Sequence, residues 1–252
     1  MLTERQNEVL KMIIQEYSDT AIPVSSGLLI EKYDSSFSSA TLRNEMAKLE
    51  ELGFLIQPHV SAGRIPSDKG YRYFIDNLLD RDKVDLDYQK TLELKLLNLR
   101  TKNARLERTT AKLLSSMSHC LAISGVVDKN EFYDFGMHNL LDDPELASQN
   151  DLSKLIMVLD VIDENLDKVL RDIQDGEVRI FIGEENPIQE AQNYSMIVSP
   201  YERSDGERGL LAIIGPKRMK YEQNKGLIEF MRRALGGQKY LMSLLLMINL
   251  IK

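Results

Sequence analysis

Apolar residues recur at helical spacing in the first segments of the chain. The first segment carries Val9, Leu10, Ile13, Ile14 and Tyr17. This spacing predicts a helix, and Thr3 with Gln6 has the form of a capping box at its start. Pro23 then interrupts the pattern, after which Ser25 or Ser26 can begin a second, short helix. The apolar residues of that helix are Leu28, Leu29 and Tyr33.

A third helix is predicted between Ser38 and Gly53, with serine at its start and glycine at its end. Its apolar stripe should pack on the first two helices and consists of Leu42, Met46, Leu49 and Leu52. A short strand, a tight turn and a second strand follow, and Ser67 can then begin a fourth helix. This order matches a winged helix-turn-helix domain, whose third helix enters the major groove of DNA. The pattern therefore predicts binding to duplex DNA.

Polar and basic side chains on the third helix and in the wing are the candidates for contact with DNA. Arg43 could bind guanine and Asn44 adenine, because their forked groups match those base edges. Gly63 would permit a tight turn and a close approach to a phosphate. The candidate set is Ser39, Thr41, Arg43, Asn44, Lys48, His59, Ser61, Arg64, Lys69 and Arg72. Taken singly, each of these is more simply a helix cap or a solvated charge, so the prediction depends on the ordered set.

Residues 81–118 have a different pattern. They contain nine basic and five acidic residues and no Pro or Gly, which predicts a long helix. Steps of four and three trace a heptad seam that could pair two chains, and Asn103 at an a position could fix its register. The seam consists of Leu92, Leu96, Leu99, Asn103, Leu106, Thr110, Leu113 and Met117. The alternative is an amphipathic helix that lies on its own domain.

The remainder of the chain alternates helical and strand patterns, which predicts an α/β domain. Helices are expected over residues 152–173 and 225–235, and strands over 178–182, 196–198 and 209–214. A polar turn at 204–207 predicts a hairpin, so the sheet should be antiparallel, consistent with part of a GAF-like fold. The segment 183–187 is interpreted as a turn rather than a metal loop. The apolar tail 240–251 is expected to be a buried or dimer-facing helix, with membrane association as a minor alternative.

Two separated blocks of the sequence resemble one known family. The first block, residues 38–76, contains Ala40-Thr41-Leu42-Arg43-Asn44-Glu45-Met46, Pro58-His59, Ser61-Ala62-Gly63-Arg64-Ile65-Pro66 and Gly70-Tyr71-Arg72. The second contains Gly136-Met137-His138-Asn139-Leu140-Leu141, Ile182-Gly183-Glu184-Glu185-Asn186-Pro187 and Ile213-Ile214-Gly215-Pro216-Lys217-Arg218-Met219-Lys220-Tyr221. In this order they are similar to the signatures of the HrcA heat-inducible transcription repressors of bacteria.

The resemblance implies a homodimeric repressor that binds an inverted-repeat operator upstream of chaperone genes and is released on heat stress. It also implies dependence on the chaperonin. Family members are longer, and the missing stretch falls between Val127 and Phe132, so the regulatory domain should be shortened. The expected fold is α+β: an N-terminal winged helix-turn-helix domain (1–80), a helical linker (81–118) and a shortened GAF-like α/β C-terminal domain (119–252).

Composition limits these predictions. The chain has 252 residues, 43% of them hydrophobic, which is enough for two domains with cores. Residues 1–80 hold eight basic and twelve acidic residues, whereas DNA-binding domains are usually basic. The deficit of basic residues lies outside the predicted DNA-binding segment, because residues 39–72 hold five basic and four acidic residues. Modest nonspecific affinity with strong salt dependence is expected.

Few residues suggest chemistry beyond binding. A single cysteine, Cys120, fits a reducing cytoplasm, and no apolar run is long enough to span a membrane, so a cytoplasmic location is expected. His119 and Cys120 would point to opposite sides of a strand, and His59, His119 and His138 lack metal-ligand spacing. We therefore expect no enzyme activity, metal or cofactor. The alternatives to a heat-shock repressor are a winged-helix regulator controlled by a small metabolite and an interaction module without repressor activity.

Overall fold

The computed structural model describes residues 2–33, 37–79, 106–141, 143, 157, 165, 168–203 and 205–236. The chain divides into two compact units, each described by itself below. One comprises Met1–Arg81 with Lys217–Lys220, and the other comprises Asp82–Pro216 with Tyr221–Lys252. We call them the N-terminal unit and the C-terminal unit.

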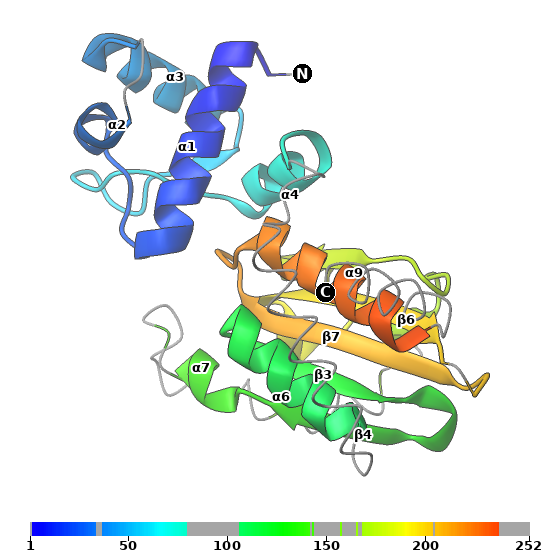
Figure 1. Ribbon diagram of the computed structural model, residues 1–252. Coiled ribbons are helices and arrows are strands. Elements are labelled where there is room, and N and C mark those ends of the chain that lie inside the picture. The colour runs from blue at the N-terminus through cyan, green and yellow to red at the C-terminus, as the bar shows by residue number, and fades with distance from the viewer. Residues whose placement is uncertain are drawn as a thin grey trace, which may run out of the picture. The chain divides into compact units, whose positions relative to one another are not determined.

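Three helices, a short two-stranded sheet and a fourth helix form the N-terminal unit (Figure 1). Helix α1 covers Glu4–Thr20, α2 covers Ser26–Lys32, α3 covers Ser39–Glu51 and α4 covers Asp68–Asn77. The predicted capping box of Thr3 and Gln6 is present, and Ser25, Ser38 and Ser67 are the N-caps of the other three helices. Strands β1 (Leu55–Ile56) and β2 (Ile65–Pro66) pair antiparallel. The predicted order of elements is confirmed.

The core of the N-terminal unit is formed where α3 packs on α1 and α2. Its most buried apolar residues are Val9, Leu10, Ile13, Val24, Leu29, Leu42, Met46, Leu49, Leu55 and Tyr71. One residue of the predicted α3 stripe departs from it, because Leu52 is the C-cap and 47% exposed. The helix ends there, and Gly53 takes a φ of +77°, so the chain turns before Leu52 can reach the core.

A five-stranded antiparallel sheet forms the centre of the C-terminal unit, in the order β4-β3-β7-β6-β5. Its strands are β3 (Leu121–Val126), β4 (Glu131–Phe135), β5 (Arg179–Ile182), β6 (Tyr194–Glu202) and β7 (Arg208–Pro216). The hairpin expected at residues 204–207 joins β6 to β7, with Glu202 opposite Arg208. Strand β4 was not predicted, because only two of its five residues, Phe132 and Phe135, are partly buried.

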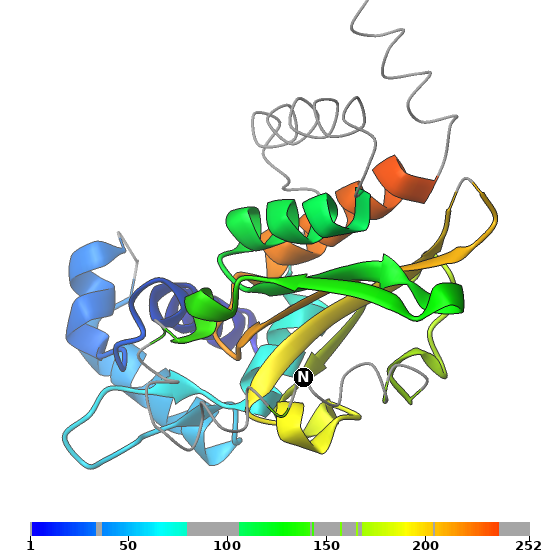
Figure 2. The same cartoon turned by 90° about the horizontal axis from the view of Figure 1, so that it is seen from below.

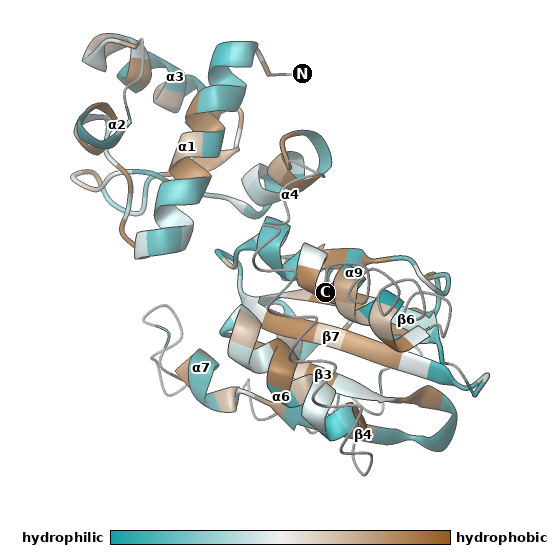
Figure 3. Ribbon diagram, in the orientation of Figure 1, coloured by the Kyte–Doolittle hydropathy of each residue, from teal (hydrophilic) through white to brown (hydrophobic). Residues whose placement is uncertain are grey.

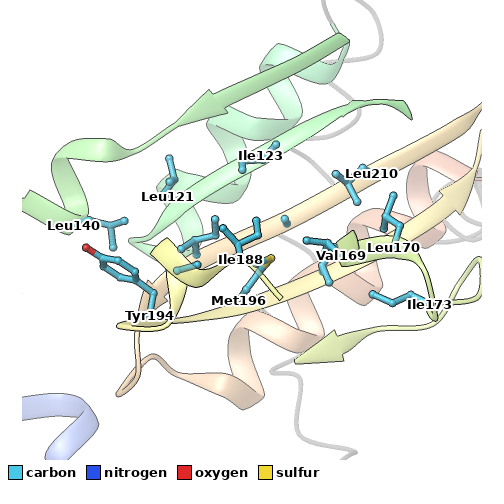
Figure 4. Close-up of a cluster of buried hydrophobic side chains, with 14 residues drawn as sticks. Leu121, Ile123, Leu140, Val169, Leu170, Ile173, Ile188, Tyr194, Met196 and Leu210 are labelled. Atoms are coloured by element: carbon cyan, nitrogen blue, oxygen red, sulfur yellow. The ribbon is translucent and has the colours of Figure 1, made fainter. Parts of the chain in front are cut away.

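Both faces of this sheet are covered. Helices α6 (Leu106–Ser118) and α9 (Tyr221–Gly236) lie on one face, as Figure 2 shows. The opposite face carries the apolar cluster of Figure 4, in which strand residues such as Leu121, Met196 and Leu210 meet Leu140 of helix α7 (Met137–Leu141). Burial on both faces explains why β7 is apolar along most of its length (Figure 3). The antiparallel, helix-flanked sheet predicted from the sequence is confirmed.

Helix α6 contains two of the expected dimer residues, Leu106 and Leu113. Thr110, Leu113 and Leu114 are buried, and the helix packs on β3 and β4 of its own unit. Leu106 and Leu113 therefore belong to a helix that covers this sheet, and residues 106–118 are part of the C-terminal unit rather than of a separate linker. The alternative of an amphipathic helix on its own domain holds for this segment. The other seam residues, Leu92, Leu96, Leu99 and Asn103, lie outside the described residues.

Three further expectations concern the C-terminal unit. Residues 183–185 form a short 3-10 helix, and the Glu185 carboxylate accepts a hydrogen bond from the Ile182 N–H, so the segment is a turn as predicted. The helix expected over 225–235 is α9, which begins earlier, at Tyr221. Most of the helix expected over 152–173 and the whole tail 240–251 lie outside the described residues.

Candidate DNA-binding surface

The outer side of α3 carries the central candidates. Leu42, Met46 and Leu49 are buried, whereas Arg43, Asn44 and Lys48 are exposed. Side chains with base-reading or phosphate-binding groups therefore point away from the core, together with Ala40 and Glu51. Ser39 and Thr41 are half-buried. The Thr41 hydroxyl lies 2.9 Å from that of Ser38, so Thr41 takes part in the start of the helix.

The two basic residues of α3 have different partners. Lys48 Nζ lies 3.1 Å from the carboxylate of the buried Glu45, which offsets its charge. Arg43 Nε donates to the hydroxyl of Ser26, 3.3 Å away, at the start of α2. Among the described residues no carboxylate pairs with Arg43, and a hydroxyl does not offset its positive charge. Arg43 is therefore better placed than Lys48 to bind an electronegative base edge or a phosphate.

The loop between β1 and β2, which we call the wing, is fixed to the α1–α2 connection. Val24 and Arg64 exchange backbone hydrogen bonds of 2.9 and 2.8 Å in an isolated bridge. A Cβ on Gly63 would lie 2.5 Å from the carbonyl of Val24. Gly63 is thus required for close packing of two backbone segments within the unit, while the expected approach to a phosphate stays a prediction.

Arg64 is held by a residue near the end of α3. Its Nε and Nη2 both donate to one carboxylate oxygen of Glu50, at 3.0 and 2.8 Å, and both side chains are partly buried. The ion pair joins the wing to α3 and offsets the charge that the sequence assigned to phosphate binding. The geometry gives Arg64 a positioning role: it sets the wing relative to α3.

Lys69 and Arg72, the candidates on α4, also have partners within the N-terminal unit. Lys69 Nζ donates to the carbonyl of Leu52 at 2.7 Å and lies 4.6 Å from the centre of the Phe54 ring. Arg72 forms an ion pair with Asp76, 3.3 Å away and one turn along α4. Lys69 thus satisfies a carbonyl at the end of α3, where a cation is favoured by the helix dipole. His59 and Ser61 are exposed in the wing.

Sequence patterns did not reveal three residues of this surface. Arg5, in the first turn of α1, lies over the ring of Phe37, which directly precedes the cap of α3. Gln57 binds the backbone of the wing, and Val60 projects from it. Position alone gives no signal for Arg5, since it shares its helical turn with Glu4 and Glu8.

Acidic residues of the N-terminal unit are partly neutralised inside it. The Glu16 side chain is 3% exposed, and Lys32 Nζ lies 2.7 Å from it. This hydrogen bond raises the pKa of Lys32 above its ordinary value. Glu16, Glu45 and Glu50 are each paired with a cation, so they add little negative field at the exposed side of α3. The exposed side of α3 can therefore serve as a DNA-binding surface although the domain as a whole is acidic.

The order of elements and this surface define a winged-helix domain joined to an antiparallel α/β domain. The family model of the HrcA protein C terminal domain matches residues 73–224. That match covers more than half of the chain, so the chain belongs to the HrcA family.

Two relatives show how the chain compares with longer members. The heat-inducible transcription repressor HrcA of Chloroflexus aurantiacus is 42% identical over 123 residues, which is 49% of this chain and 33% of that protein. The chain thus matches about a third of the length of that relative. The repressor of the same name from Thermodesulfovibrio yellowstonii is 26% identical over 341 residues, covering 93% of this chain and 97% of the relative. Because that alignment is longer than the chain, the relative holds segments that this chain lacks.

A solved structure, described only as a hypothetical protein, shares the fold. It has a TM-score of 0.76 and 20% identity, and the match covers 93% of this chain and 97% of that one. This likeness extends over both units, which supports the α+β assignment.

Both relatives are named as transcription repressors. Across the residues described, no group of three or more His, Cys, Asp and Glu is placed to hold a metal ion. His119 is exposed with a φ of +53°, whereas the neighbouring Cys120 is buried. None of the helices in the described part of the chain is both long and apolar enough to cross a membrane.

Proposed function

We propose that this protein is a sequence-specific DNA-binding repressor of heat-shock (chaperone) operons. It binds an inverted-repeat operator as a homodimer, through α3 and the wing of each copy, in the cytoplasm. The observation that carries the proposal is the placement of Arg43 and Asn44 on the exposed side of a helix whose other side is fully buried. Release on heat stress and dependence on the chaperonin follow from the family resemblance.

The dimer is part of the proposal because an inverted repeat is matched by a two-fold axis between two copies. Of the expected seam, α6 is committed to its own sheet. The pairing surface is therefore proposed to lie in residues 81–105 or in the tail. Asp substitution of Leu99 within the full chain, followed by sedimentation with and without operator DNA, would separate these two segments.

The first prediction tests the recognition helix. Arg43→Ala and Asn44→Ala should each weaken binding to operator DNA by about 1 to 3 kcal/mol, roughly 5- to 150-fold in Kd, because each removes a side chain able to make a bidentate base contact. Fluorescence anisotropy against the upstream regions of chaperone operons would measure the loss. Both positions lie outside the core, so thermal unfolding should be unchanged.

Matched controls for this test are Arg171→Ala and Asn193→Ala, which remove the same residue types at exposed positions of the C-terminal unit. They should bind as the wild type does. If both α3 variants also bind unchanged, α3 does not read the operator and the proposal loses its central observation.

A second prediction concerns the ion pair between Arg64 and Glu50. Arg64→Ala should weaken operator binding without changing the salt dependence, because its charge is already offset by Glu50. Glu50→Ala should weaken binding too, and the double variant should lose less than the sum, as expected for two residues that act as one unit. A salt titration of the three variants measures both effects. A salt slope flatter by about one unit in Arg64→Ala alone would instead identify a phosphate contact.

A further inference from the structure

The tip of the wing presents an apolar side chain to solvent. Val60 is 97% exposed, more than any other large apolar residue among those described. It therefore contributes almost no burial to the N-terminal unit, and the fold does not require an apolar residue there. The neighbouring His59 and Ser61 are also exposed, and residues 58–63 contain no carboxylate. The tip thus combines an apolar side chain with flanks that do not repel a polyanion.

The backbone of this tip is fixed from within. The Gln57 amide donates hydrogen bonds of 3.0 Å to the carbonyls of both Val60 and Ala62. The Ala62 N–H donates to the His59 carbonyl at 2.8 Å. One side chain therefore occupies two of the acceptors that the loop would otherwise expose. Together these bonds close the tip into a single turn that directs Val60 outward.

The base of the wing is equally constrained. The Val24–Arg64 bridge and the close packing of Gly63 fix the loop to the α1–α2 connection, and the ion pair between Arg64 and Glu50 fixes it to α3. The tip is thus held relative to the helix that is proposed to enter the major groove. A β-branched valine adds little rotamer freedom of its own. An apolar side chain on a fixed loop binds at a lower entropic cost than one on a flexible loop.

We propose that Val60 enters the minor groove of the DNA bound by α3, where it makes an apolar contact with the sugar walls and base edges. Gln57 is the positioning residue that holds it there. The inference rests on the proposed function. It follows from the placement of an outward apolar side chain on a rigid loop tied to α3, because DNA-binding proteins frequently insert apolar side chains into the minor groove. The contact favours A·T pairs, whose minor groove lacks the guanine amino group.

The test uses the full chain and a duplex that it selects from a random pool. Val60→Thr keeps the shape of the side chain and adds a hydroxyl, so it should lower affinity roughly 5- to 10-fold through the lost apolar contact. Ile22→Thr is the control, since Ile22 is 61% exposed in the same unit but outside the wing. It should bind as the wild type does. Thermal unfolding of both variants should match the wild type.

Substitution of base pairs in the duplex shows which groove Val60 contacts. Each A·T pair flanking the α3 site is replaced in turn by inosine·cytosine, which keeps the minor-groove pattern of A·T and changes the major groove, or by G·C, which changes both. At the pair that Val60 contacts, the ratio of wild-type to Val60→Thr affinity should persist with inosine·cytosine and fall to about one with G·C. A ratio that falls with inosine·cytosine, or persists with G·C at every pair, would overturn the assignment.

Gln57→Ala completes the test, because a positioning residue acts through Val60. It should lower affinity about as much as Val60→Thr, and the double variant should lose no more than either single variant. Equal binding by wild type and Val60→Thr to the selected duplex would refute the inference and leave the proposed function standing. If the wild type selects no duplex, both fail.

Discussion

Replacing Gly70 with alanine is expected to destabilise the N-terminal unit by about 2 kcal/mol or more, although alanine is the better helix former. Gly70 lies in the first turn of α4, and a Cβ there would be 2.2 Å from the carbonyl oxygen of Phe54. That oxygen cannot simply swing away, because it accepts a hydrogen bond from the Ser67 N–H at 3.1 Å. The helix must therefore shift as a whole.

The shift should also be visible in DNA binding. Helix α4 holds Lys69 against the end of α3, so its displacement disturbs the junction between the recognition helix and the wing. Urea unfolding of the full chain, followed by circular dichroism, would measure stability, and anisotropy would measure operator affinity. Both should fall in the Gly70→Ala variant.

Gly27→Ala provides the matched control. Gly27 is an exposed glycine in α2, and the atom nearest to a Cβ added at this position would be the Ser25 hydroxyl oxygen, 3.8 Å away. The substitution should be neutral or stabilise the unit by roughly 0.5 to 1 kcal/mol. If Gly70→Ala were as stable as Gly27→Ala, the close approach of α4 to Phe54 would not exist in solution.

The elements of the N-terminal unit were predictable because their signals are local. Thr3 with Gln6 and the serines at 25, 38 and 67 lie within a few residues of the helix starts that they cap. The apolar period of α3 and the stop at Gly53 are likewise properties of one segment. Local signals fail at the end of the helix, as Leu52 shows. Its spacing continues the apolar stripe of α3, but the helix ends at this residue and its side chain stays exposed.

What the sequence could not supply are pairings between distant residues. Arg64 and Glu50 are fourteen positions apart, and Gly63 packs on a segment some forty residues earlier. A basic residue next to a wing glycine therefore suggested a phosphate contact, whereas tertiary structure gives it a carboxylate partner. For the same reason, heptad spacing could not decide between a second chain and the protein's own sheet as the partner of α6.

Replacing Leu114 with alanine is expected to lower the temperature at which the protein releases its operator. Leu114 is fully buried in α6, against the sheet of the C-terminal unit. Removing its side chain should cost about 2 to 5 kcal/mol, which for a unit of this size lowers the unfolding temperature by roughly 5 to 15 °C. If heat releases the operator by unfolding this unit and thereby the dimer, the temperature of DNA release should fall by the same amount.

The two temperatures should shift together because operator affinity depends on the dimer. A separated copy contacts only one half-site of the operator. A temperature ramp on the full chain would follow operator occupancy by anisotropy and unfolding by circular dichroism in the same sample. Lys112→Ala is the control, because Lys112 is an exposed residue two positions away on α6, and it should shift neither temperature. Should Leu114→Ala lower the unfolding temperature but leave release unchanged, thermal unfolding is not the switch. A bound metabolite would then account better for induction.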